Sequence, residues 1–154
     1  MKWILSLLAI LLITVLGWLP FQGTDVATLE PAESIYVSIE NEKVCVETDG
    51  GWLGSGKSVE EAVADLNKSA PGKVFLETVD YLLLKKGCEN LIPALYSYLR
   101  SGCSVCLVEE KPDLQNVSEY LRAHRLSLTL QDYRAGNTKI PELRMEEDRG
   151  YLDE

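Results

Sequence analysis

Apolar and polar residues alternate with a period of two near the start of the folded part of the chain. Ile35, Val37 and Ile39 are separated by polar residues or tyrosine, and the alternation resumes after Asn41-Glu42 at Val44 and Val46. A period of two indicates strands with one buried face. The pattern therefore predicts a β-hairpin with its turn at Asn41-Glu42. Asp49-Gly50-Gly51 ends the second strand, where glycine supplies the backbone freedom of a sharp turn.

A helical period follows. Ser58-Val59-Glu60-Glu61 has the spacing of a capping box, in which the Ser58 hydroxyl accepts from the Glu61 amide and the Glu61 carboxylate reaches back. Apolar residues then recur at i, i+3, i+4 and i+7, at Val59, Ala62, Val63 and Leu66. This spacing predicts a helix that buries one stripe of side chains.

The rest of the body alternates strands and helices. Residues 74–84 are apolar and β-branched enough for a strand, although a helix competes for this stretch. Asn90 is expected to cap a second helix that ends at Gly102 in the left-handed conformation. A buried strand at 105–108, a third helix through Leu114, Val117 and Leu121, and a last strand at 126–131 complete the pattern. The order is β-β-α-β-α-β-α-β, which predicts an α/β fold, a single small domain with a mixed β-sheet.

The first 20 residues differ from this body. Residues 3–19 form an apolar run between Lys2 and Pro20, which as a helix would span roughly 25 Å against a hydrocarbon core of ~30 Å. The run is therefore either an uncleaved transmembrane helix or the core of a signal peptide. We favour the helix, because bulky residues stand where a small-x-small cleavage site is expected, and tryptophans stand at both ends of the run.

Charge predicts the orientation of this segment. Lys2 precedes the run, whereas Asp25, Glu30 and Glu33 follow it. By the positive-inside rule, the N-terminus lies in the cytoplasm and the body lies outside, in a single-pass membrane protein. The expected division is a transmembrane anchor or signal segment at 1–20, a linker at 21–33, the α/β domain at 34–134, and an acidic, disordered tail at 135–154.

The formal net charge of −9 changes the range of partners. A strongly acidic chain has little attraction for phosphate backbones, so nucleic acid is not an expected partner. Binding through the sheet edge or the helix surfaces to other proteins, and through the N-terminal helix to the membrane, is expected instead.

One stretch satisfies a phosphate-binding motif. Gly51-Trp52-Leu53-Gly54-Ser55-Gly56-Lys57-Ser58 fits G-x-x-x-x-G-K-[ST], and residues 105–109 could act as the acidic strand that organises magnesium. However, the preceding strand runs through Glu47 and Asp49, which would repel phosphates, and the predicted orientation places the stretch where ATP is scarce. We interpret it as a strand-to-helix turn, with a P-loop-like nucleotide-binding protein using Lys57 and Ser58 as the alternative.

The cysteines suggest a second alternative function. Cys45, Cys88, Cys103 and Cys106 form an even set, and outside the cytoplasm any of three disulfide connectivities is allowed. Cys103 and Cys106 have redox-motif spacing, but they enter a strand instead of opening a helix. Core cysteines are the expected interpretation, with a thiol or disulfide protein as the alternative. His124 is interpreted as a solvated cation at a helix end. No catalytic, metal or cofactor-binding residue is predicted.

The segment from Gly56 to Val108 resembles the N-terminal domain of the Ger(x)C spore-germination proteins, membrane-attached subunits of germinant receptors in spore-forming bacteria. Gly56, Ser58, Glu61, Ala62 and Leu66 are similar to that domain's glycine and following helix. Further similarity is found at Lys73-Val74-Phe75-Leu76, at 79–84, at Gly87, Leu91, Leu95 and Leu99, and at 105–108.

This resemblance implies a non-enzymatic module in a sporulation or germination assembly, at the cell membrane or, as an alternative, at the spore inner membrane. The chain departs from the family in three ways. It has no lipobox cysteine near Leu19, it lacks the family's histidine near Glu77-Thr78, and it lacks the later domains. We therefore expect an extracytoplasmic, helix-anchored interaction module that is no enzyme and uses no cofactor.

Overall fold

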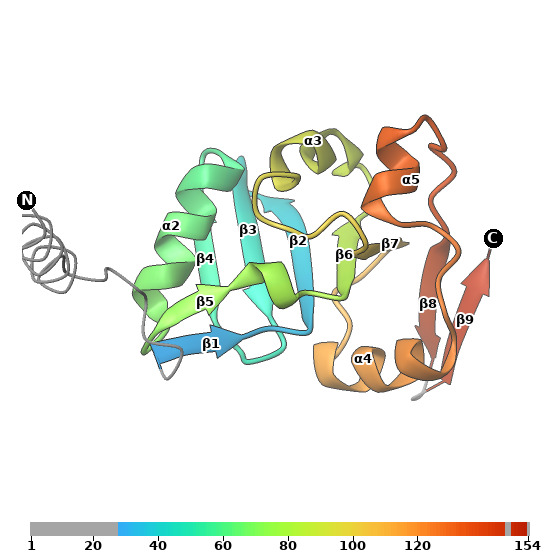
Figure 1. Cartoon of the computed structure of the whole chain (residues 1–154), viewed down its shortest axis with the longest axis horizontal. Coiled ribbons are helices and arrows are strands. Elements are labelled where there is room, and N and C mark those ends of the chain that lie inside the picture. Colours follow the sequence, from blue (N-terminus) through green and yellow to red (C-terminus); the bar gives the residue numbers. More distant parts are fainter. Residues whose placement is uncertain (1–27, 147–148, 154) are drawn as a thin grey trace, which may run out of the picture.

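A seven-stranded mixed sheet forms the centre of the structure, a computed structural model that describes residues 28–146 and 149–153. The strand order is β4-β3-β2-β6-β7-β8-β9, and helices lie on both faces (Figure 1). The predicted α/β class with a mixed sheet is confirmed. The predicted anchor at 1–20 lies outside the described residues, and within them no helix is long and apolar enough to cross a membrane.

The predicted hairpin is present. β2 (Ser34–Glu40) and β3 (Lys43–Thr48) pair antiparallel, with Glu40 opposite Lys43. Both turn residues, Asn41 and Glu42, have positive φ (50° and 63°). This left-handed pair matches the right-handed twist of a two-residue hairpin, which explains why a turn without glycine closes it.

The glycine stretch is a third strand, where the sequence predicted only a turn. β4 (Leu53–Gly56) pairs antiparallel with β3, and the turn between them spans residues 49–52, with Gly51 at φ 79°. α2 (Val59–Ser69) follows and buries the predicted stripe. Ser58 caps it as expected, but the Glu61 carboxylate accepts from the Lys57 amide at 2.8 Å instead of the Ser58 amide.

The single strand predicted at 74–84 is two strands. β5 (Lys73–Phe75) pairs in parallel with β1 (Leu29–Pro31), which lies in the expected linker, and the 3₁₀ turn η2 (Leu76–Thr78) leads to β6 (Tyr81–Lys85). The hydroxyl of Thr78 bonds to the carbonyls of Phe75 at 2.7 Å and Ala32 at 3.0 Å. This local bonding diverts the chain between two apolar segments that sequence periodicity does not separate.

The second helix is much shorter than predicted. Asn90 lies inside the 3₁₀ turn η3 (Glu89–Leu91) and caps nothing, and α3 (Ile92–Leu95) ends well before Gly102. Gly102 is also absent from the glycines with positive φ among the described residues. β7 (Ser104–Val108) and α4 (Leu114–Ala123), capped by Asp113, agree with the prediction.

The C-terminal part of the structure departs most from the elements predicted from the sequence. The strand predicted at 126–131 is a loop leading into α5 (Leu130–Arg134), because Thr129 and Asp132 form a complete capping box. Residues expected in a disordered tail instead form β8 (Glu142–Glu146) and β9 (Arg149–Asp153), an antiparallel hairpin that extends the sheet. Its anchor is Leu143, which is 2% exposed.

Alternation along the strands divides the core between the two faces of the sheet. One face holds α2, α3 and α5, through residues such as Leu66, Ile92 and Leu130. The other holds α4, whose Val117 and Leu121 pack with Leu83 and Cys106. Each face is thus closed by its own apolar cluster.

Candidate functional site

The glycines of the phosphate-motif stretch serve helix packing. α2 lies so close to β4 that a Cβ built on Gly54 would come within 2.6 Å of the Leu66 Cα, and one on Gly56 within 2.7 Å of the Ala62 nitrogen. Real Cβ atoms do not approach other atoms so closely. Only glycine lets a helix backbone approach a strand in this way.

The backbone amides of this stretch are already occupied. The Ser55 amide donates to the Asp65 carboxylate at 3.0 Å, and the Lys57 amide donates to Glu61 at 2.8 Å. A phosphate cradle needs free amides converging on an anion. Here two carboxylates of α2 take that place, so the motif does not build a phosphate site in this geometry.

The proposed acidic strand lies far from the motif. β7 is separated from β4 by β3, β2 and β6, which at strand spacings of roughly 4.8 Å places them roughly 19 Å apart. Glu109 pairs with Lys86 at 3.1 Å on the surface, and the lysine holds the pKa of this carboxyl below its usual value. The residues that would share a nucleotide are not brought together.

The cysteines also fail to form a pair. Cys103 belongs to the core cluster on the α2 and α3 face, and Cys106 to the cluster under α4. Residues three apart along an extended chain point to opposite faces. All four cysteines are free, and burial raises the pKa of both Cys103 and Cys106 to about 12. A protonated, buried thiol is a weak nucleophile.

Histidine is placed as predicted at the end of α4. The His124 ring stacks on Tyr120 with ring centroids 4.2 Å apart, and its Nδ1 lies 3.1 Å from the Tyr120 carbonyl oxygen. It is exposed to solvent. Its contacts are those of a helix end.

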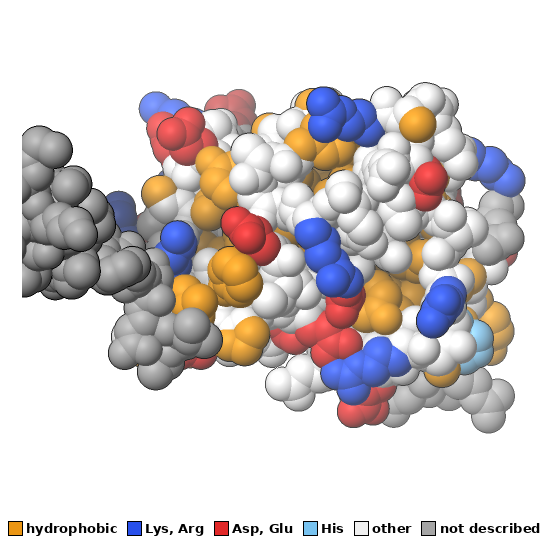
Figure 2. All heavy atoms as spheres, in the orientation of Figure 1, with side chains coloured by type: hydrophobic (Ala, Val, Ile, Leu, Met, Phe, Trp, Pro, Cys, Tyr) orange, Lys and Arg blue, Asp and Glu red, His pale blue; other side chains and the backbone are white. Residues whose placement is uncertain are grey.

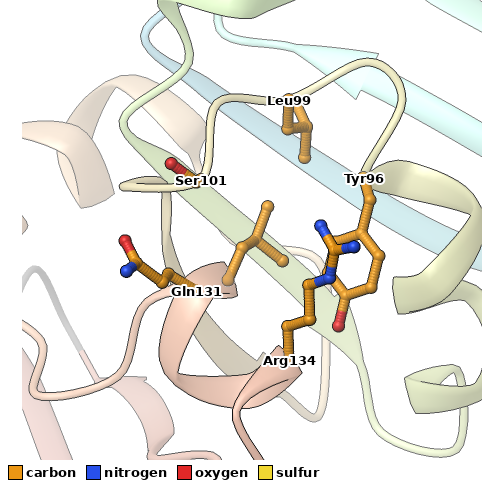
Figure 3. Close-up of a pocket in the computed structure, with 6 residues that line it drawn as sticks. Tyr96, Leu99, Ser101, Gln131 and Arg134 are labelled. Carbon is orange, nitrogen blue, oxygen red and sulfur yellow. The ribbon is translucent and has the colours of Figure 1, made fainter.

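Two surface hollows do bring polar side chains together, and sequence analysis predicted neither. The first lies between α3 and α5 and has a volume of about 350 Å³ (Figure 3). The Arg134 guanidinium lies 5.7 Å from the centre of the Tyr96 ring, a cation–π distance. Leu99 and Leu130 supply the apolar part of the lining. Ser101 and Gln131 lie on the side away from Tyr96 and Arg134.

The second hollow, of about 400 Å³, lies at the N-terminal ends of β6 and β7. Its rim has two guanidinium groups, those of Arg100 and Arg125. Arg100 forms an ion pair with Asp80. Its lining is completed by Tyr81, Gly102, Ser104 and Leu126.

A further arginine stands beside this second hollow. Arg122 Nε donates to the Glu33 carboxylate at 2.6 Å and holds the pKa of Glu33 below its usual value. Burial, followed by the charge of Glu33, raises the pKa of Tyr81, while Arg122 and Arg125 act in the opposite direction. Both arginines therefore lie close enough to act on the phenol. Figure 2 shows basic and acidic side chains interleaved over this part of the visible face.

A weak sequence signal for these hollows existed, since every arginine of the chain follows residue 99. The residues come from the segments that follow α3 and α4, from the starts of β6 and β7, and from α5, so no local motif indicates that they meet. Comparisons of the chain with models of known protein families, with curated proteins and with solved structures each found no match.

Proposed function

We propose that this chain is a non-enzymatic interaction module, tethered through residues 1–20 to the outer face of a bacterial membrane. Its role is in a sporulation or spore-germination assembly, as the resemblance of residues 56–108 to the Ger(x)C domain implies. Its partners are other membrane or spore proteins.

The proposal rests on the location of the polar groups that have no charged partner among the described residues. Among the described residues, every buried side-chain nitrogen or oxygen has a hydrogen-bond partner. In contrast, the surface guanidinium groups of Arg125 and Arg134 form no ion pair with any described residue. Polar chemistry in the core is thus used for folding, and the guanidinium groups of Arg125 and Arg134 face solvent at the two hollows, where they suit recognition.

The two rival functions are less well supported by the geometry. For a nucleotide-binding protein, the loop amides would have to release Asp65 and Glu61 before accepting phosphate. For a thiol protein, Cys103 and Cys106 would have to leave opposite core clusters. Surface binding requires neither rearrangement.

Topology is the first test. A reporter pair, one active only outside the cytoplasm and one only inside, is fused in turn after Glu154 in the source bacterium. The expected result is activity of the external reporter alone. A cytoplasmic C-terminus would contradict the proposal and would make the nucleotide interpretation worth testing again.

Partner contact is the second test. A photo-crosslinking amino acid is placed at Gln131, beside the first hollow, and at Lys68, on the exposed side of α2. Crosslinking in membranes of sporulating cells is expected to give a discrete product from position 131 and none from position 68. Equal, diffuse labelling at both positions, or monomer alone, would count against a specific interaction surface. Abundance of the chain in spores, compared with vegetative cells, tests the sporulation role separately.

A further inference from the structure

The two hollows share one wall. In the loop that follows α3, Leu99 and Ser101 line the hollow beside α5, while Arg100 and Gly102 line the hollow at β6 and β7. Residues 125–131 are divided in the same way. Arg125 and Leu126 line the hollow at β6 and β7, and Leu130 and Gln131 line the hollow beside α5. The antiparallel bridge between Ser104 and Thr129 ties these two segments together. The hollows therefore lie on either side of these two segments.

Each hollow presents a guanidinium group without a carboxylate partner among the described residues. Arg134 has only the Tyr96 ring, and Arg125 has no ion pair there. Arg100 is paired with Asp80, but a guanidinium has five N–H donors and one carboxylate does not use all of them. The two hollows are lined by three arginines and one carboxylate, that of Asp80, in a chain whose net charge is −9.

We propose that this surface, defined by Arg100, Arg125 and Arg134 with Tyr96 and Tyr81, binds a carboxylate-rich peptide segment of a partner protein. The inference rests on the proposed interaction function and specifies its partner chemistry. Guanidinium groups bind carboxylates through paired N–H donors. The apolar lining at Leu99 and Leu130 suits the aliphatic part of glutamate side chains.

The arrangement favours a peptide over other anions. A single small anion fills one hollow and leaves the second free arginine unused, whereas an extended segment passes over the shared wall and reaches both. An anionic lipid surface is flat, whereas the free guanidinium groups lie at two separate hollows. A flexible peptide that carries several carboxylates can place one at each hollow.

The experiment measures binding of fluorescein-labelled hexaglutamate to the full chain, purified in an uncharged detergent, by fluorescence anisotropy. Hexaglutamine with the same label is the uncharged control probe. We expect saturable binding of hexaglutamate that weakens as salt is added, because exposed ion pairs are screened. Absence of binding up to about 1 mM, or equal binding of hexaglutamine, would overturn the proposal.

Variants locate the site. Arg125→Gln and Arg134→Gln are each expected to weaken binding about threefold to tenfold, and the double variant more than either. The affinity of Arg125→Lys for hexaglutamate is expected to lie between those of wild type and Arg125→Gln, since lysine keeps the positive charge and loses the paired N–H donors of the guanidinium group. Arg144→Gln is the matched control, because Arg144 lies on β8 beside Glu142 and Asp153. If Arg144→Gln weakens hexaglutamate binding as much, or if Arg125→Gln and Arg134→Gln do not weaken it, the peptide binds elsewhere on the chain. Circular dichroism verifies that each variant is folded.

Two further outcomes separate this proposal from its premise. Phosphorus NMR of glycerol phosphate, a probe for lipid headgroups, is expected to show no Arg125-dependent line broadening. Such broadening without hexaglutamate binding would mean a phosphate site instead of a peptide site. If crosslinks form at position 131 but hexaglutamate does not bind, the interaction function stands and the acidic partner is wrong. If hexaglutamate binds but the Glu154 reporter is cytoplasmic, the peptide site stands and the location is wrong.

Discussion

Leu66 on α2 lies directly over Gly54 on β4, with 2.6 Å between the Leu66 Cα and the place a Gly54 Cβ would occupy. Leu66 is fully buried, so the helix cannot move outward without opening the core. The contact explains why a glycine-rich stretch that matches a nucleotide-binding motif forms a strand packed against α2.

This contact predicts that Gly54→Ala is strongly destabilising. The added methyl group meets the helix backbone, which cannot rotate away as a side chain would, so we expect a loss of roughly 2–4 kcal/mol in unfolding free energy. Urea unfolding of the full chain measures it. Gly102→Ala is the control, because nothing lies within 4 Å of its Cβ position, and a change within about 1 kcal/mol is expected. Equal effects would mean that the packing argument is wrong.

Lys57 and Ser58 of the phosphate-motif stretch are predicted to matter for helix capping alone. Ser58→Ala removes the acceptor of the Glu61 amide and should cost about 1 kcal/mol of stability. Lys57→Ala leaves its backbone amide bonded to Glu61 and should change little. A fluorescent ATP analogue is expected to bind neither wild type nor Lys57→Ala. Tight binding that depends on Lys57 would refute the interpretation of this stretch.

Thiol reactivity is predicted to follow burial. Cys45 is partly exposed on the outer face of β3, whereas Cys88, Cys103 and Cys106 are buried. Alkylation of the native protein at pH 8 should therefore modify Cys45 first, and the other three only after unfolding, as mass spectrometry of peptides would show. An intact Cys103–Cys106 disulfide in unreduced protein would be incompatible with the two-faced arrangement.

The Glu33–Arg122 pair predicts a small dependence of stability on acid. Hydrogen bonding to Arg122 lowers the pKa of Glu33 from an ordinary value of 4.5. The stabilisation is fully present above pH 4.5 and is lost as pH falls below it through the folded-state pKa. Because the pair is on the surface, the effect is at most about 1 kcal/mol. Unfolding free energies measured between pH 6 and pH 3 should decline less in Arg122→Gln than in wild type, and parallel declines would argue against the pair.

The sequence by itself determined the elements whose signals are local. The period of two at 35–46 gave the hairpin, and the i, i+3, i+4, i+7 stripe with Ser58 gave α2. These elements follow from side-chain periodicity and a cap, which act over a few residues.

Tertiary structure decided what local signals leave undetermined. β4 exists because α2 covers Gly54, and β8 and β9 exist because Leu143 completes the cluster under α4. The alternating leucines at 126, 128 and 130 are buried in two different clusters, and so do not form a strand. The arginine surface depends on where four separate segments meet, and the burial energy that brings them together is not encoded in any one of them.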